Sequence, residues 1–529
     1  MSEFGLVTDN EFFTIKNGEN LIFKVRRQDY GSSTQSPGDI ASLIYKGVEY
    51  QDKSRGSQIN SGFDWLYNGI YDVNVEAELI NDDIVKVTVR AGYLTHYYIV
   101  RKGEDNIYMG TYFTQQPDVH GHVRYILRTN YSLLPYGPEP SDLHGTTKTI
   151  ESADIFSTDD GHTKSKHYSN QRLKDWSYIG ATGDNVGLWV VRGNAEGMSG
   201  GPFYRSLLNQ ASEDQEITYI INYGMAQTDV FRTKILNLYT LVFNDGSQPE
   251  KPGLTWLADT NLLGWIPLEN RGGINCTGID GLDGKSTYTV SFSNKSSFYW
   301  CIINNITTQF KCEGLIPGEY DLTVFKNELE VLKDTVTVIS GATTQISHLT
   351  ITDDPSFVES LWRIGEWDGS PQELMNGDKI TVMHPTDVRM SDWTPETYTI
   401  GQSVPNKHFP AYQCRNINND IKINFRLTSE QLGASRLRIG TTTAGQGGRP
   451  AINVNGWIAK SGAPVQPKTR NITVGTYRGF NTLYTFDIPE GVLKEGENTL
   501  TISVISGSGG AGWLGPSFAY DAVDLIRQQ

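Results

Sequence analysis

The sequence predicts an all-β protein built from three domains. Glycine accounts for 54 of its 529 residues and tyrosine for 27, and short segments of alternating apolar and polar residues recur between turn residues. Such segments are typical of strands, and the 3.6-residue periodicity of helices is nearly absent. A chain of this length exceeds one ordinary hydrophobic core, so we expect units of about 100 to 250 residues each.

The first predicted domain spans residues 1–262 and carries long alternating segments. A proline- and glycine-punctuated passage, residues 245–267, marks its end. Because each segment is bounded by turn residues, we expect the strands of an all-β domain and not βαβ units. The segments are DIVKVTVRAGYLTHYYIVRK (83–102), IYMGTYFTQ (107–115), VGLWVVRG (186–193) and EITYIINYG (216–224).

Two further β domains follow. Residues 263–352 contain four to seven short strand segments in about 90 residues, among them GKSTYTVSFSN (284–294), which favours a small immunoglobulin-like or fibronectin type III-like sandwich. Residues 353–529 contain regularly spaced strand segments with glycine-rich turns, among them IKINFRLT (421–428) and SRLRIGTTTAG (435–445). This spacing predicts a larger sandwich or jelly roll, an architecture common among carbohydrate-binding domains.

Charge and composition exclude several classes of partner. The formal net charge is −15 and the pI is about 5.1, which argues against nucleic acid and anionic membranes, because both require a basic surface. No segment approaches the roughly 20 apolar residues of a membrane helix. A polyanionic ligand therefore requires a local basic cluster, and TKSKHYSNQR (163–172) is the best candidate.

The N-terminus has no basic start followed by an apolar core, so we expect no signal peptide within this chain, while one that has been removed is compatible with the sequence. Sequons nevertheless favour an extracellular protein, and we expect a monomer. Cys301 and Cys312 flank a segment that reads as a hairpin, so either a disulfide or two buried thiols is compatible with the sequence. The sequons lie at Asn130, Asn275, Asn294, Asn305 and Asn471.

Motifs for nucleotide, serine-hydrolase and metalloprotease chemistry are absent: the chain contains no GxxxxGK[ST], GxSxG or HExxH. A paired-carboxylate glycoside hydrolase is also not supported, because no convincing Asp/Glu pair stands out. The turns at 353–355 (DDP) and 366–369 (EWDG) offer oxygen ligands, so a structural Ca²⁺ is a candidate, although solvated turns are the commoner outcome.

Four motifs in the first domain resemble the catalytic domain of rhamnogalacturonan endolyases of polysaccharide lyase family 4. They are VRYILRTNYSLLP (123–135), TKSKHYSNQR (163–172), SGGPFYR (199–205) and NYGMAQTDVFR (222–232). The downstream motifs RIGEWDGSP (363–371), MHPTDVRMSDW (383–393), LRIGTTTAGQGGRP (437–450) and TYRGFNTLYTFDIP (476–489) resemble that family's C-terminal domain. The resemblance covers essentially the whole chain in the right order.

This resemblance implies a galactose-mutarotase-like β-sandwich, a fibronectin type III-like module and a carbohydrate-binding-like jelly roll. It also implies cleavage of rhamnose-(1→4)-galacturonate linkages in rhamnogalacturonan I, a plant cell-wall pectin, by β-elimination, with no catalytic cofactor. Such a site needs a base for the C5 proton, a cation for the carboxylate and an acid for the departing O4.

The resemblance assigns roles to individual residues. Lys166 matches the family's catalytic lysine, taken to be the base, and Arg124 matches an arginine suited to gripping a carboxylate in fork geometry. Arg470 resembles an arginine of the C-terminal domain that reaches toward the substrate. Tyr223 and Tyr168 are further candidate substrate-binding residues.

The chain departs from the family at Met225, which occupies the position of the catalytic histidine in GMAQTD (224–229). A thioether is no useful proton donor, although Met225 still counts among the predicted substrate-binding residues. The chain could be a lyase with another acid, could act on a related rhamnose-uronate polymer, or could only bind pectin. Alternation predicts that His167 faces away from Lys166. Candidate acids are His167, His144, His162, Tyr168 and Tyr223.

Overall fold

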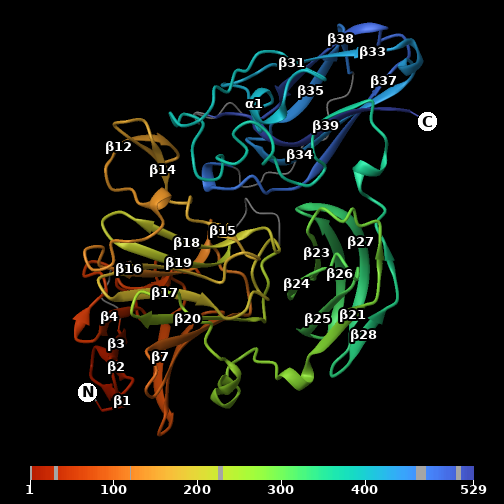
Figure 1. Ribbon diagram of the computed structural model, residues 1–529. Helices are drawn as coiled ribbons and strands as arrows, with labels where there is room; N and C mark the ends of the chain where they lie inside the picture. Colours follow the sequence, from red (N-terminus) through yellow and green to blue (C-terminus); the bar gives the residue numbers. More distant parts are fainter. Residues whose placement is uncertain are drawn as a thin grey trace.

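The all-β prediction is confirmed. The computed structural model describes residues 3–28, 34–119, 121–223, 230–459, 472–507 and 514–528. Across these ranges the regular structure is almost entirely β-strand, and the α-helix they contain is the short α1 (Pro405–His408). Figure 1 shows three β units, with the third unit (blue) lying across the ends of the first (red to yellow) and the second (green).

The first unit is a large sandwich. Its main layers are a seven-stranded sheet, β16-β17-β20-β10-β9-β8-β7, and a five-stranded sheet, β15-β18-β19-β11-β6. A second five-stranded sheet, β1 to β5, and a small three-stranded sheet, β12-β13-β14, extend it. The strands are β1 (Gly5–Thr8), β2 (Phe12–Lys16), β3 (Leu21–Arg26), β4 (Ile40–Tyr45), β5 (Val48–Glu49), β6 (Gln58–Ile59), β7 (Val73–Asn81), β8 (Ile84–Ala91), β9 (Leu94–Arg101), β10 (Asn106–Phe113), β11 (Val123–Thr129), β12 (Thr146–Glu151), β13 (Ile155–Thr158), β14 (Thr163–Ser165), β15 (Gln171–Arg172), β16 (Tyr178–Gly183), β17 (Val186–Arg192), β18 (Arg205–Ala211), β19 (Gln215–Asn222) and β20 (Leu236–Asn244).

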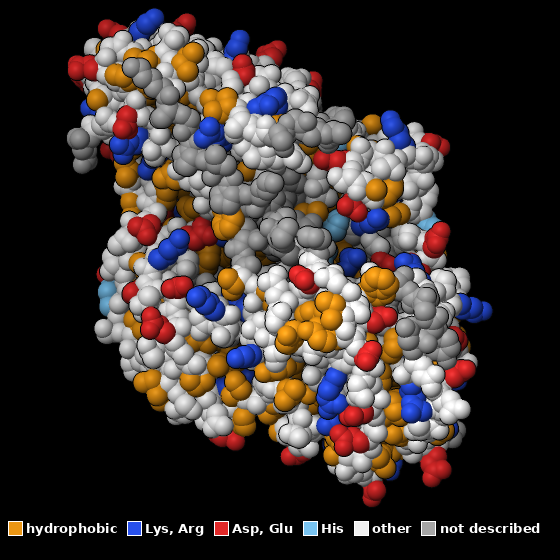
Figure 2. Space-filling view, turned by 180° about the vertical axis from the view of Figure 1, so that it is seen from behind, with side chains coloured by type: hydrophobic (Ala, Val, Ile, Leu, Met, Phe, Trp, Pro, Cys, Tyr) orange, Lys and Arg blue, Asp and Glu red, His pale blue; other side chains and the backbone are white. Residues whose placement is uncertain are grey.

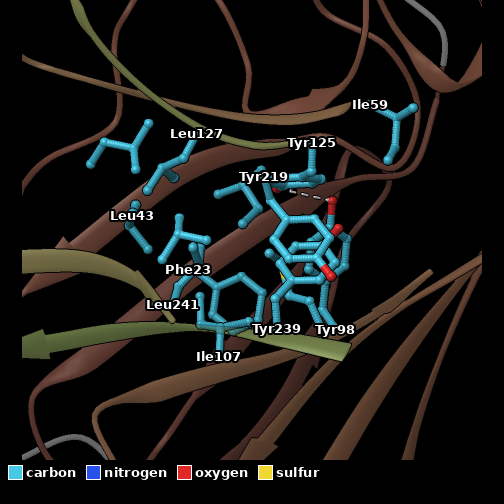
Figure 3. Packing of buried hydrophobic residues seen from close by; sticks show 14 of the residues in the cluster. Phe23, Leu43, Ile59, Tyr98, Ile107, Tyr125, Leu127, Tyr219, Tyr239 and Leu241 are labelled. Atoms are coloured by element: carbon cyan, nitrogen blue, oxygen red, sulfur yellow. Dashed lines mark hydrogen bonds between the residues drawn. The ribbon is translucent and has the colours of Figure 1, made fainter. Parts of the chain in front are cut away.

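Tyrosines fill much of the core between these sheets. Tyr219 and Tyr239 stack with ring centroids 4.0 Å apart, and the hydroxyls of Tyr98 and Tyr125 lie 3.3 Å apart (Figure 3). The Tyr98 hydroxyl also donates a hydrogen bond to the Gly38 carbonyl. These bonds satisfy buried polar atoms that would otherwise destabilise the core.

Strand alternation leaves one face of the five-stranded sheet outside this core. Val123, Tyr125 and Leu127 on β11 point into the sandwich and are at most 2% exposed. Arg124 must therefore point to the opposite face, because successive strand residues alternate sides. That outer face carries the candidate active site.

The second unit is a small sandwich, whose largest sheet has the order β24-β23-β26-β27. Of the two predicted alternatives for Cys301 and Cys312, the structure has free thiols: the two residues lie on β24 and β25, strands of different sheets, and their side chains pack in the same core. Its strands are β21 (Gly272–Cys276), β22 (Ile279–Asp280), β23 (Tyr288–Ser293), β24 (Phe298–Ile302), β25 (Phe310–Leu315), β26 (Gly318–Lys326), β27 (Leu329–Val338), β28 (Thr343–Ile346) and β29 (Leu349–Thr350).

The third unit packs two five-stranded sheets around a core of its own. In one sheet β39 pairs with β30, β32 and β34, while the other has the order β31-β33-β38-β35-β36. Its strands are β30 (Trp362–Gly365), β31 (Tyr398–Thr399), β32 (Tyr412–Cys414), β33 (Ile421–Leu427), β34 (Ser435–Gly445), β35 (Arg449–Val454), β36 (Trp457–Ile458), β37 (Thr482–Ile488), β38 (Gly496–Ile505) and β39 (Ser517–Arg527).

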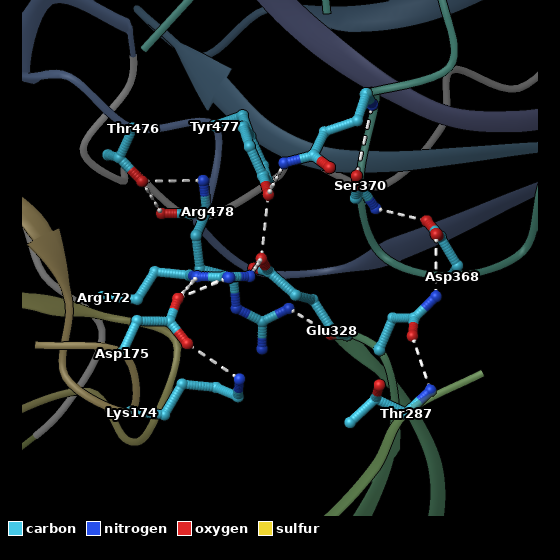
Figure 4. Close-up of polar contacts among 12 residues, drawn as sticks. Arg172, Lys174, Asp175, Thr287, Glu328, Asp368, Ser370, Thr476, Tyr477 and Arg478 are labelled. Atoms are coloured by element: carbon cyan, nitrogen blue, oxygen red, sulfur yellow. Dashed lines mark hydrogen bonds and ion pairs between the residues drawn. The ribbon is translucent and has the colours of Figure 1, made fainter. Parts of the chain in front are cut away.

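A buried carboxylate joins all three units. Glu328 of the second unit accepts hydrogen bonds from Arg172 of the first (2.7 Å) and from the Tyr477 hydroxyl of the third (2.8 Å), as Figure 4 shows. Its backbone carbonyl accepts a further bond from Arg478 (2.6 Å). Since Glu328 is only 2% exposed, these contacts fix the position of the third unit relative to the first.

The surface matches the acidic composition. Lys and Arg side chains are intermingled with Asp and Glu over the face seen in Figure 2, without a broad basic field. No helix within the described residues is long and apolar enough to cross a membrane.

Candidate active site

Within the described residues, no carboxylate contacts the guanidinium of Arg124 directly. Its backbone NH donates to Asn60 Oδ1 (2.8 Å), but its side chain makes no hydrogen bond or ion pair with a described residue. Burial lowers the pKa of Arg124, and the charges of Glu216 and Asp154 partly offset that effect. A half-buried, unpaired guanidinium is poised to bind a carboxylate from outside the protein.

Lys166 lies near the same acidic side chain. Its Nζ is 3.4 Å from Asp154 Oδ1, its backbone NH donates to the Asp154 carbonyl, and its side chain is 33% exposed. His167 Nε2 lies 4.0 Å from Asp154 Oδ2, so both neighbouring side chains reach one carboxylate. The alternation predicted for His167 was wrong, because residues 166–169 form a turn that follows β14 instead of an extended strand.

His122, which no sequence motif singled out, belongs to the same cluster. Its ring centroid lies 4.7 Å from that of Tyr223 and 6.0 Å from that of His167. His122 precedes β11 and is two residues from Arg124. Residues i and i+2 share a face of an extended chain, so the position of His122 two residues before Arg124 could have identified it from the sequence.

Of the other predicted substrate-binding residues, the two tyrosines are buried and the remaining two lie outside the described residues. Tyr168 is 1% exposed, and its hydroxyl has no hydrogen-bond partner within the described ranges, so it does not face substrate in this conformation. Burial raises its pKa well above the ordinary value. Tyr223 is 2% exposed and packs against His122 instead of opening to solvent. Met225 and Arg470 lie outside the described residues.

Two other candidate acids are engaged elsewhere. His144 Nδ1 lies 2.7 Å from Asp142 Oδ1, and its ring stacks on Tyr131 at 3.9 Å. His162 Nδ1 lies 3.5 Å from Asp160 Oδ2. Both imidazole side chains are 43% exposed.

The third unit holds the segment that carries Lys166. Asp387 accepts hydrogen bonds from both the backbone NH (2.7 Å) and the hydroxyl (2.8 Å) of Thr163 on β14. His384, which is fully buried, places Nε2 3.1 Å from Glu151 at the end of β12. These contacts tie the small β12-β13-β14 sheet of the first unit to a loop of the third.

A glycine of the third unit approaches the Lys166 turn from the other side. Gly475 has a φ of +69°, and a Cβ there would lie 2.7 Å from the carbonyl oxygen of His167. Next to it, Thr476 accepts a hydrogen bond from Arg205 at the start of β18, and the Tyr204 hydroxyl donates to the Gly479 carbonyl (2.7 Å). Only a residue without a side chain allows this close backbone approach.

The candidate calcium turns have other partners. Asp354 caps a 3₁₀ turn by accepting from the Ser356 NH, and it pairs with Lys326 Nζ at 2.9 Å. Asp368 accepts from Asn327 Nδ2 at 3.0 Å. The described part of the chain contains no group of three or more His, Cys, Asp or Glu side chains placed to hold a metal ion.

The cluster thus combines groups of complementary chemistry. Arg124 supplies a fixed positive charge, Lys166 an amine that reaches solvent, and His122 an imidazole that contacts the neighbouring His167 ring. Met225 contributes nothing that replaces the proton chemistry of a histidine. Charge neutralisation and two proton transfers are the three requirements of elimination next to a carboxylate.

Comparison with known proteins agrees with this chemistry. Residues 4–264 match the family model for the N-terminal region of rhamnogalacturonan lyase B, and residues 275–346 and 360–525 match domains II and III of polysaccharide lyase family 4. A probable rhamnogalacturonate lyase A from Aspergillus flavus is 34% identical, with 99% of this chain and 96% of that protein covered.

Two further relatives have the same coverage of both chains. A putative rhamnogalacturonase from Neurospora crassa is 35% identical, and rhamnogalacturonate lyase A from Aspergillus aculeatus is 34% identical. The match runs through all three units and includes the segments that carry Arg124 and Lys166. The chain therefore belongs to polysaccharide lyase family 4, the family of the rhamnogalacturonan lyases.

Proposed function

We propose that this protein cleaves the rhamnose-(1→4)-galacturonate linkages of rhamnogalacturonan I by β-elimination. Family membership over the whole chain supports the substrate class. The observation that carries the proposal is the half-buried guanidinium of Arg124, which no carboxylate of the described ranges contacts, in the same cluster as the amine of Lys166. A hydrolase would instead require a water-activating pair of carboxylates, and Asp154 is held between Lys166 and His167.

Arg124 binds the galacturonate carboxylate. Removing the C5 proton places negative charge on that carboxylate as an enolate-like species develops, so a fixed cation stabilises the transition state more than the ground state. The planar guanidinium can hold both oxygens, which orients the C5–H bond toward the base.

Lys166 removes the C5 proton in its neutral amine form. The C5–H electron pair becomes the C4=C5 double bond, the C4–O4 bond breaks, and O4 leaves with the preceding rhamnose. The product is an unsaturated uronate, and no water is consumed. Asp154 positions the amine through its contact with Nζ, while the turn at 166–169 presents it to solvent.

The proposal is tested by following the ultraviolet absorbance of the unsaturated product from rhamnogalacturonan I. We expect the native protein to form this product and Lys166→Ala to be slower by about 10²- to 10⁴-fold, the usual contribution of a general base. Lys164→Ala is the matched control, because Lys164 sits two residues away and pairs with Glu139. A native protein that binds the polymer without forming product would identify a noncatalytic binder or a different rhamnose-uronate substrate.

The setting of this activity follows from the substrate. A plant cell-wall polysaccharide lies outside cells, so we propose an extracellular enzyme. We further propose that it acts as a monomer and needs no cofactor for elimination, with any bound Ca²⁺ serving structure alone. Rates that survive exhaustive treatment with a chelator would support this.

A further inference from the structure

Elimination leaves one requirement that Lys166 and Arg124 do not meet. The departing O4 would leave as an alkoxide, a poor leaving group in water, unless an acid donates a proton as the C4–O4 bond breaks. The identity of that acid rests on the proposed elimination, because a protein that only binds polysaccharide needs none. The thioether of Met225 cannot supply the proton.

Exposure and position separate the candidates. Tyr168 and Tyr223 are at most 2% exposed and His167 is 6% exposed, so their polar atoms lie beneath the surface. His144 and His162 each lie against an aspartate of their own loop. His122 is only half-buried, and its ring packs against those of Tyr223 and His167 within the cluster.

A backbone contact determines which nitrogen of His122 exchanges protons. Its Nδ1 lies 3.1 Å from the carbonyl oxygen of Tyr223. A carbonyl oxygen only accepts hydrogen bonds, so Nδ1 carries a hydrogen and donates it. In the neutral ring Nε2 is then the basic nitrogen, and protonation of the ring places the second proton there.

We propose that His122 is the general acid of this enzyme and donates the Nε2 proton to the departing O4. The C4–O4 electron pair forms the new O–H bond as the C5–H electron pair forms the C4=C5 double bond, so a neutral alcohol leaves and His122 ends the step neutral. Lys166 ends it as the ammonium ion. Proton exchange with water restores both residues for the next cycle.

The groups around His122 come from three segments. Arg124 lies two residues along the chain, and the His167 ring, 6.0 Å away, leads to the Asp154 carboxylate and the Lys166 amine. The Tyr223 carbonyl, which follows β19, holds Nδ1.

The decisive variant is His122→Asn. The asparagine amide nitrogen can occupy the place of Nδ1 and keep the hydrogen bond to Tyr223, while the proton-transferring Nε2 is lost. We expect kcat on rhamnogalacturonan I to fall by about 10²- to 10⁴-fold with KM nearly unchanged. His144→Asn is the matched control. The Nδ1 of His144 also forms a hydrogen bond, but its partner is Asp142 of the same loop and not a group of the cluster.

A substrate with an activated leaving group separates catalysis from structure. A synthetic galacturonide with a nitrophenoxy group at C4 needs no protonation to leave, so we expect His122→Asn to process it at close to the native rate. An unchanged kcat on the polymer, or equal impairment on both substrates, would overturn the role of His122. If His122→Asn does not fold, His122→Gln provides the same comparison.

The two proposals fail in different ways. A native protein that forms no unsaturated product refutes the proposed elimination. A native protein that is active, is inactivated by Lys166→Ala and is unaffected by His122→Asn keeps the elimination and refutes only the identity of the acid.

Discussion

At the scale of single residues, two arginines of β11 show how context separates a binding group from a structural one. Arg128 donates to Glu216 (3.2 Å) and to the Gly56 carbonyl (2.8 Å), so its charge is compensated. Arg124, four positions earlier on the same strand, has no such partner among the described residues. Its half-buried charge is therefore available to an anionic substrate.

Arg124→Lys keeps the charge but loses the fork geometry. We expect kcat/KM on rhamnogalacturonan I to fall by about 10- to 100-fold, because a hydrogen bond to a charged group contributes roughly 1.5–3 kcal/mol. The initial rate of unsaturated product measures this. Arg90→Lys, in the exposed pair with Glu76, is the control and should leave the rate unchanged. Equal rates for native protein and Arg124→Lys would exclude bidentate binding.

At the scale of elements, the strand that precedes Lys166 depends on another unit for its position. Desolvation is the largest single effect on the pKa of Asp387 and raises it. The hydrogen bonds that Arg389 and Thr163 donate to the carboxylate together outweigh desolvation, so the pKa of Asp387 lies below the ordinary range. A depressed folded-state pKa stabilises the protein at pH above the unfolded value. This contribution is lost as the pH falls through the folded value.

Asp387→Asn should therefore lower the melting temperature at neutral pH, by about 2–4 °C for each kcal/mol lost. The difference from the native protein should shrink as the pH falls below the pKa of an ordinary carboxyl group, because Asp387 of the unfolded chain then takes up a proton, and it should vanish once the folded protein is protonated as well. Melting curves across this range measure both effects. Asp83→Asn removes only an exposed pair with Lys102 and should show neither; a pH-independent difference for Asp387→Asn would contradict the linkage.

The close approach of Gly475 gives a second prediction at this scale. Gly475→Ala would place a Cβ against the His167 carbonyl at a positive φ, so the turn that carries Lys166 must shift. We expect at least about a tenfold loss of kcat, since small displacements of reacting groups are costly. Gly491→Ala tests for strain alone, because Gly491 has a φ of +85° and open space around it. Native activity in Gly475→Ala would show that the turn tolerates the shift.

At the scale of the whole molecule, the second unit contacts both of the other units and fixes their relative position. The Glu328 carboxylate contacts Arg172 and Tyr477, and its carbonyl contacts Arg478, so one residue links all three cores. Removing one partner of a buried charge pair leaves the other uncompensated, which is more costly than never forming the pair. The candidate site should depend on this junction although Glu328 takes no part in the chemistry.

Glu328→Gln should destabilise the protein by about 3 kcal/mol, measured by denaturant unfolding with a probe in each unit. The transition of the third unit should separate from that of the first, and activity should fall through loss of the Gly475 contact. Glu313→Gln, in the exposed pair with Lys311, should change neither stability nor activity. A single unchanged transition in Glu328→Gln would show that the junction does not couple the units.

Much of the fold could be predicted because strand patterning is local. Alternation in β8, β9, β10, β17 and β19 marks each strand, and turn residues mark its ends. The same rule failed at His167, since a turn breaks the alternation there. For the cysteines the sequence left a disulfide and two thiols open, and the structure has free thiols on β24 and β25, two strands of different sheets.

The sequence alone determined the all-β class and, through motifs shared with a lyase family, pointed to Arg124 and Lys166. Only the tertiary structure decided which groups surround them. The Thr163–Asp387 bond spans 224 residues, and His122 meets Tyr223 across 101 residues. Such contacts depend on how sheets and units pack, a property of the whole chain that no local period encodes, and they decide where the carboxylate and the transferred protons can be held.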